Sequence, residues 1–241
     1  MRRDPVRVPF FGRDGMLLLL TAAAGSMDVA SYLGLGHVFT AMMTGNTVLL
    51  GMALGQGHLL AALRSVLALI GFAGGVALAA MLVLRDRHGE WSPAVTSALA
   101  IEGALLVVFS LTWYLSGPTP DDLVVYWLIA VAGVAMGIQS GAVHRLRVPG
   151  VMTTYITGTL TSLMSDLTSR LQRIEDSASG TSPRERRVGL MAAVFIVYAL
   201  GALAGAVLHL QSPALMTLLP VSAVLIVVAN AALCHRRGQI L

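Results

Sequence analysis

The chain has 241 residues, of which 56% are hydrophobic and 12% charged, and its formal net charge at pH 7 is +4. A soluble domain usually carries about 25% charged residues, so this composition excludes a soluble globular protein and predicts an integral membrane protein. All sixteen basic residues are arginines, and they lie between apolar runs, which is typical of membrane orientation and not of a nucleic-acid-binding face. The single cysteine, Cys234, excludes an internal disulfide and a cysteine-based metal cluster.

Apolar runs predict the membrane segments of the first half. An arginine-bearing arm (1–15) precedes an apolar run that continues to residue 35, and this length favours a retained transmembrane helix over a signal peptide. An interrupted apolar segment and two helices follow, at 38–56, about 63–84 and about 93–115. The turn at 116–122 contains prolines and aspartates and marks an internal boundary.

The second half has the same kinds of segment in the same order. Its predicted segments are a helix at about 123–143, an interrupted segment at 151–166, an exposed arginine-bearing loop at 166–187, and helices at about 188–210 and 213–233. Both halves carry a GxxxG pattern, at Gly71/Gly75 and Gly201/Gly205, and a Ser-Pro-Ala sequence that we expect to open a helix, at residues 92 and 212. These matches predict one transmembrane domain (1–241) made of two internal repeats, about 14–115 and 122–234.

Each interrupted segment has a Thr-Gly pair followed by a third polar residue. These triplets are Thr44-Gly45-Asn46 and Thr157-Gly158-Thr159. Irregular backbone inside a bilayer must be satisfied by protein or by a water-filled cavity, so the triplets predict breaks that line a polar interior. Helix amino termini that meet there would favour an anion or a group with acceptor oxygens. In the structural alternative, the triplets only cap and pack a kinked helix.

The distribution of arginines favours one topology. If the two Thr-Gly segments enter and leave on the same side, six helices span, fifteen arginines lie in the cytoplasm and only Arg64 lies outside. If all eight segments span, twelve lie inside and four outside. The positive-inside rule favours the first arrangement, an all-α bundle of six spanning helices, two re-entrant segments and inverted repeats, with both termini cytoplasmic. The alternative is eight spanning segments in parallel repeats.

Two carboxylates lie within predicted helices. Asp28 lies twelve residues after Met16, and Glu102 lies nine residues into its helix. Ionisable residues at such depth cost about 2.5 to 3.5 kcal/mol and are candidates for ion binding or proton transfer. Asp28 has a structural alternative, in which it satisfies backbone N–H groups near Thr44. Its counterpart in the second repeat, Gln139, is neutral.

The residues already named also carry a family resemblance. Gly25-Ser26-Met27-Asp28, Met43-Thr44-Gly45-Asn46-Thr47, Met136-Gly137-Ile138-Gln139 and Thr157-Gly158-Thr159 resemble signatures of the YoaK family of bacterial membrane proteins. The resemblance covers nearly the whole chain except the amino arm and the 166–187 loop. It implies about six membrane helices and a place in the bacterial inner membrane. The family is a domain of unknown function, so the resemblance supplies no substrate and no catalytic residue.

These features predict a secondary transporter or channel for a small polar solute, with proton coupling, rather than an enzyme. The predicted binding residues are Asp28, Thr44, Gly45, Asn46, Glu102, Gln139, Thr157, Gly158 and Thr159. The alternative function is a non-transporting protein that binds a partner or lipid through its arginine-rich loop. No motif predicts a cofactor, a metal site or nucleic-acid binding. The expected surroundings are membrane lipid, and assembly into a homo-oligomer stays open.

Overall fold

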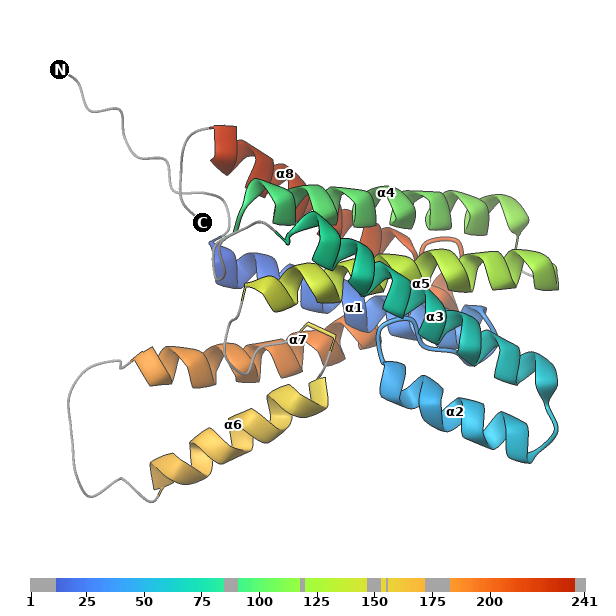
Figure 1. Ribbon diagram of the computed structural model, residues 1–241, viewed down its shortest axis with the longest axis horizontal. Coiled ribbons are helices and arrows are strands. Elements are labelled where there is room, and N and C mark those ends of the chain that lie inside the picture. The colour runs from blue at the N-terminus through green and yellow to red at the C-terminus, as the bar shows by residue number, and fades with distance from the viewer. Residues whose placement is uncertain are drawn as a thin grey trace.

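The computed structural model describes residues 12–84, 91–117, 120–146, 153–154, 156–171 and 183–236. In these residues the regular structure consists of eight helices (Figure 1), as expected for an all-α protein. They are α1 (Arg13–Gly34), α2 (Met43–Gly55), α3 (Leu59–Leu82), α4 (Pro93–Ser116), α5 (Asp122–Arg145), α6 (Ile156–Leu171), α7 (Pro183–Gln211) and α8 (Leu218–Arg236).

Six of the described helices are long and apolar enough to cross a membrane, namely α1, α3, α4, α5, α7 and α8. The other two, α2 and α6, have 13 and 16 residues. At about 1.5 Å per residue they reach about 20 and 24 Å, short of the roughly 30 Å hydrocarbon core. Six candidate spans are therefore confirmed, and the eight-segment alternative would need spans that these two helices do not supply.

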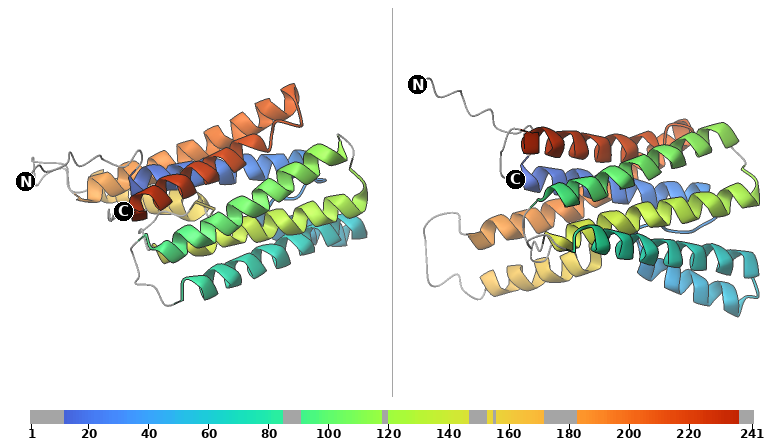
Figure 2. Two further views of the ribbon diagram at one scale, coloured as in Figure 1. Left: turned by 90° about the horizontal axis from the view of Figure 1, so that it is seen from above. Right: turned by 45° about the horizontal axis from the view of Figure 1, so that its top comes forward.

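The long helices lie side by side in an elongated bundle, and the two short helices lie along one side of it (Figures 1 and 2). In Figure 1, α2 runs from the middle of the bundle to the end where α1 stops and α3 starts. Helix α6 runs from the middle to the opposite end, where α5 stops and α7 starts. The amino ends of both short helices therefore face the middle of the molecule.

Small residues bring two pairs of parallel helices into close contact. Gly71 and Gly75 of α3 pack on the α5 backbone around Gly133 and Gly137. Gly201 and Gly205 of α7 pack on α1 at Ala22 and Ser26. Without a Cβ in the crossing, the backbones approach closely, which is the usual role of GxxxG in membranes. Each of the two GxxxG patterns found in the sequence thus lies at the contact of a pair of parallel helices.

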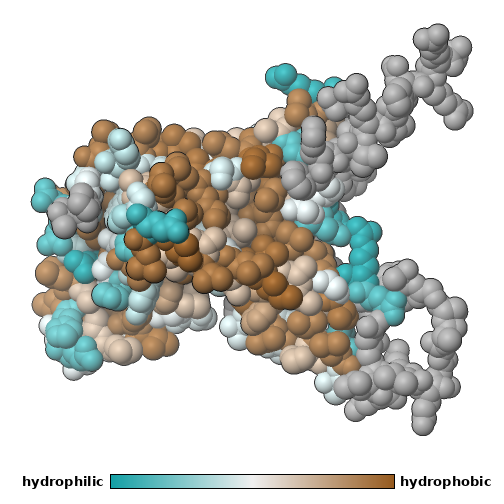
Figure 3. Space-filling view, turned by 180° about the vertical axis from the view of Figure 1, so that it is seen from behind, coloured by the Kyte–Doolittle hydropathy of each residue, from teal (hydrophilic) through white to brown (hydrophobic). Residues whose placement is uncertain are grey.

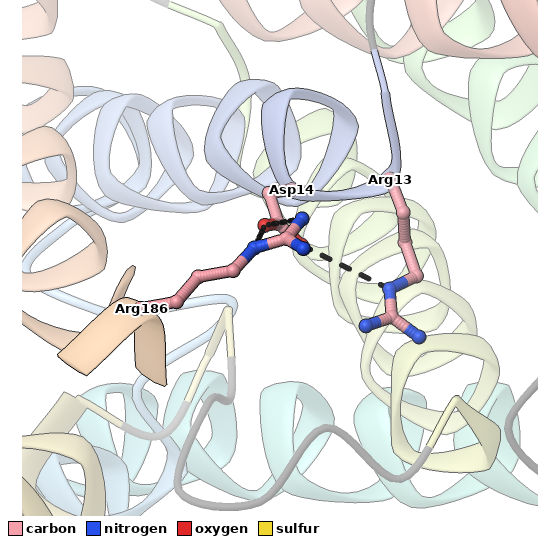
Figure 4. Close-up of polar contacts among 3 residues, drawn as sticks. All are labelled: Arg13, Asp14 and Arg186. Carbon is pink, nitrogen blue, oxygen red and sulfur yellow. Dashed lines mark hydrogen bonds and ion pairs between the residues drawn. The ribbon is translucent and has the colours of Figure 1, made fainter. Parts of the chain in front are cut away.

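An ion pair lies at the amino ends of each parallel pair. Arg186 of α7 donates to Asp14 of α1 at 2.8 Å, and Arg13 lies 3.9 Å from the same carboxylate (Figure 4). Arg64 of α3 lies 3.2 Å from Asp122 of α5. Pairs this exposed contribute at most about 1 kcal/mol each, so they orient the helix ends more than they stabilise the fold.

Two predictions about helix boundaries are wrong. Ser212-Pro213-Ala214 does not open a helix, because α8 begins at Leu218. The indole N–H of Trp113 holds this turn by donating to the Pro213 carbonyl at 2.9 Å. The stretch 166–187 is not all loop, since α6 continues to Leu171 and α7 starts at Pro183. The centre of that predicted loop lies outside the described residues.

The surface has the distribution expected of a membrane protein. Figure 3 shows hydrophobic side chains over the middle of the bundle and hydrophilic ones toward its two ends. Exposed leucines such as Leu111 and Leu203 contribute to this apolar surface. In water such a surface would drive aggregation, but in a bilayer it contacts lipid.

Candidate functional site

Asp28 holds the segment that leads into α2. One carboxylate oxygen, Oδ1, accepts the backbone N–H groups of Thr40, Ala41 and Met42 at 2.9, 2.7 and 3.2 Å. The other oxygen, Oδ2, accepts the hydroxyl of Tyr198 at 2.5 Å. The side chain is only 3% exposed, so these contacts satisfy a polar group that would otherwise be costly to bury. This arrangement matches the structural alternative for Asp28, with one addition, Tyr198.

The break in the first interrupted segment lies earlier than predicted. Helix α2 begins at Met43, so Thr44-Gly45-Asn46 occupies its first turn and does not interrupt it. The irregular backbone precedes Met43, where Asp28 accepts its N–H groups. Asn46 fixes the same segment because its side chain accepts the Phe39 N–H at 2.9 Å and donates to the Phe39 carbonyl at 2.6 Å.

Gln139, the predicted counterpart of Asp28, holds the segment that leads into α6. Its amide nitrogen donates to the Leu20 carbonyl and to the Thr153 hydroxyl, both at 3.1 Å. Next to it, the Thr154 hydroxyl donates to the Ser140 hydroxyl at 3.0 Å. Both halves therefore tie the segment before a short helix to a polar residue of a long helix. Only the first half does so with a carboxylate.

A cavity of about 310 Å³ lies between the amino ends of α2 and α6. Its described walls come from the segments that lead into α2 and α6 and from α2, α3, α5, α6 and α7. The lining residues are Ala41, Met42, Met43, Thr44, Phe72, Ser140, Thr154, Ile156, Thr157 and Tyr198. Figure 3 shows a hollow on this side of the molecule, between the lobe that carries α2 and the lobe that carries α6. Five hydroxyl groups lie on its otherwise apolar walls, a combination that is typical of sites for small molecules.

The structure brings together part of the predicted site. Thr44 and Thr157 line the cavity. Asp28, Asn46, Gln139 and Thr159 are buried and are not among the described lining residues. Gly45 and Gly158 lie in the first turns of their helices and do not line the cavity. The two triplets have the same pattern, with an exposed first threonine and a buried third residue.

Tyr198 is the functional candidate that the sequence prediction missed. It lies on the cavity wall and contacts Asp28, although 170 residues separate them. The signal was present, since this tyrosine stands in the middle of the apolar run 188–210. Membrane tyrosines usually gather near the interfaces, so one at this depth indicates a polar partner.

Glu102 lies apart from the cavity. It is fully buried on α4, and the leucines one turn to either side, Leu99 and Leu106, are fully buried as well. Within the described part of the chain neither of its carboxylate oxygens has a hydrogen-bond partner. It is not among the residues that line the cavity. The structure thus separates the two carboxylates that the sequence placed in one candidate site.

Six candidate spans and two short helices around a cavity with hydroxyl-bearing walls define a polytopic α-helical membrane protein. The chain belongs to the DUF1275 family, described as a protein of unknown function, whose model matches residues 16–231. It is 43% identical over 159 residues to the UPF0700 transmembrane protein YoaK of Bacillus subtilis (strain 168), an alignment that covers 66% of this chain and 69% of that protein. These matches confirm the resemblance found in the sequence. No solved structure matches the chain.

Proposed function

We propose that this protein is a secondary transporter or channel for a small polar solute, with proton coupling, and that the solute binds between the amino ends of α2 and α6. The observation that carries the proposal is the cavity of about 310 Å³ with hydroxyl groups from both halves of the chain. Ligand sites commonly measure about 300–1,000 Å³, so a cavity at the lower limit suits a molecule of few non-hydrogen atoms. The neighbouring Asp28 supplies an ionisable group for proton coupling.

The packing supports two inverted repeats with re-entrant short helices. Gly71 packs on Gly133 as Gly201 packs on Ala22, so α3 contacts α5 as α7 contacts α1. Each short helix starts in the middle of the bundle and runs back to the end of the bundle where the preceding long helix stops (Figure 1). In this arrangement both termini are cytoplasmic, as the arginine distribution favours. Paired interrupted segments at the midplane are characteristic of transporters built from inverted repeats.

Side-specific thiol labelling tests this topology. On a Cys234→Ala background, we expect His58→Cys to react with an impermeant maleimide added to intact cells. Leu84→Cys should react only after the cells are opened. Both positions are exposed at helix ends, so access depends on the side of the membrane. Eight spanning segments would place the two positions the other way round, and labelling at residue 84 alone in intact cells would reject the re-entrant arrangement.

Replacing Thr157 by valine should lower solute flux about tenfold, because one hydrogen bond to the solute is worth about 1–1.5 kcal/mol. Stopped-flow light scattering of proteoliposomes would follow gradients of urea, glycerol, formate and nitrate. Thr161→Val is the matched control, since it makes the same substitution one turn further along α6. The Thr161 hydroxyl donates to the Thr157 carbonyl. If none of the four solutes crosses faster than in protein-free liposomes, the proposal fails, and the partner- or lipid-binding alternative becomes the better one.

A further inference from the structure

Tyr198 is the single ionisable side chain among the described residues that line the cavity. Its hydroxyl lies 2.5 Å from Oδ2 of Asp28, which is itself behind the wall. We propose that a proton on Asp28 reverses the hydrogen-bond polarity that Tyr198 presents to the cavity, so that one proton moves together with one small monovalent anion. This inference rests on the proposed transport function and assigns its substrate class and its coupling site.

The contacts of Asp28 determine where the proton goes. Oδ1 already accepts three backbone N–H groups, which leaves Oδ2 as the oxygen that can take a proton. When the carboxylate is ionised, Tyr198 donates its hydroxyl hydrogen to Oδ2, and only the lone pairs of the tyrosine oxygen are left for the cavity. When Oδ2 carries the proton, the carboxylic acid donates to the tyrosine oxygen. The Tyr198 hydrogen is then free to turn toward the cavity.

Protonation of Asp28 also changes the charge near the cavity, and this change favours an anion as the change in hydrogen bonding does. Among the described residues, the Asp28 carboxylate contacts the N–H groups of residues 40–42 and the Tyr198 hydroxyl, and none of these groups is a cation. An ionised Asp28 therefore places an uncompensated negative charge one hydroxyl away from the cavity, which repels an anion. A protonated Asp28 removes that charge and adds a donor.

Other groups on the walls complete a set of donors for the anion. Ser140 accepts the hydroxyl of Thr154, so its own hydrogen is available to the cavity. Thr44 and Thr157 add hydroxyls from the two short helices. Proton and anion then each raise the affinity for the other, because binding linkage is reciprocal.

The asymmetry between the halves sets the number of protons. Gln139, at the position equivalent to Asp28, holds the segment before α6 with an amide, which does not take up or release a proton as a carboxylate does. Within the described residues, this arrangement gives the cavity one proton site and not two. A coupling of one proton to one monovalent anion is electroneutral.

Anion accumulation in proteoliposomes under a pH gradient tests the inference. The probes are nitrate and methanesulfonate, because anions of strong acids do not leak across the bilayer as neutral acids, and urea is the neutral comparator. A gradient of one pH unit, acidic outside, should drive about tenfold accumulation of at least one probe anion, the limit for coupling to one proton.

Asp28→Asn should abolish accumulation but not anion equilibration. The asparagine oxygen can accept the same three N–H groups, and its amide donates to Tyr198, which holds the tyrosine in the state with its hydrogen toward the cavity. Equilibration should then be as fast at pH 8 as at pH 6. Tyr198→Phe keeps the carboxylate and removes the switching hydroxyl, so anion flux at pH 6 should fall about tenfold. Tyr114→Phe, at an exposed tyrosine on α4, is the control that should match the unmodified protein.

The outcomes separate this inference from the proposed function. Movement of urea without either anion would overturn the inference and keep transport. Equal anion accumulation by the unmodified protein and the Asp28→Asn variant would also overturn it. Absence of movement of all three probes, and of glycerol and formate as well, would reject transport itself. Unchanged anion flux in a folded Tyr198→Phe variant would remove Tyr198 from the mechanism, even if Asp28→Asn does not fold.

Discussion

Gly75→Leu is expected to lower the free energy of unfolding by at least about 3 kcal/mol and to reduce sharply the yield of folded protein, whereas Gly74→Leu should be tolerated. A Cβ on Gly75 would overlap the Val134 carbonyl oxygen and lie 2.9 Å from the Ile138 nitrogen. Both are backbone atoms of α5, so neither can move aside as a side chain could. The cost should reach or exceed the upper limit of the usual range for overpacking, about 1–3 kcal/mol, because the overlapping atoms are backbone.

Gly74 makes this a matched comparison. It is the preceding residue on the same helix, it is exposed, and a Cβ there would meet nothing within 4 Å. Both variants carry the same intrinsic change in helix propensity, so their difference reports the α3–α5 contact. Size-exclusion profiles and thermal unfolding in mild detergent would measure it. Equal stability of the two variants would show that the helices are not packed as described.

Glu102→Met is expected to stabilise the protein, by about 1–3 kcal/mol. Both Glu102 oxygens are buried without a hydrogen-bond partner in the described residues. An unsatisfied buried polar group costs about 1–3 kcal/mol, and methionine replaces it with an apolar side chain of similar length that adapts to its surroundings.

Glu102→Gln separates polarity from charge. It keeps the shape and a polar end, so it should gain much less stability than Glu102→Met. Thermal unfolding of the two variants side by side would decide. Destabilisation by methionine would mean that the carboxyl group has a partner, such as a buried water, and would restore it as a candidate for proton binding.

Composition and hydropathy were sufficient to predict the class of protein. Predominantly apolar helices of 19 or more residues are long enough to cross a bilayer whatever their neighbours are, so the six candidate spans were predictable from local sequence. The GxxxG pairs were also readable, because close helix packing in lipid depends on the absence of a side chain at the contact. The Thr-Gly triplets located the two short helices for a similar reason, since polar residues within an apolar segment need a polar setting.

Only the tertiary structure decided which polar residues meet. The start of α2 at Met43, ahead of the predicted break, depends on Asp28, which accepts N–H groups 12 to 14 residues away. Tyr198 reaches the cavity because α7 packs against α1, a contact between opposite ends of the chain that no local pattern encodes. Glu102 is buried elsewhere, on α4, which packs against α5 and α8. The sequence by itself determined the protein's class and its six candidate membrane spans, because the bilayer acts on each segment separately. Which residues form the site could be determined only from the tertiary structure, because hydrogen bonds between distant residues form only when the helices that carry them are packed together.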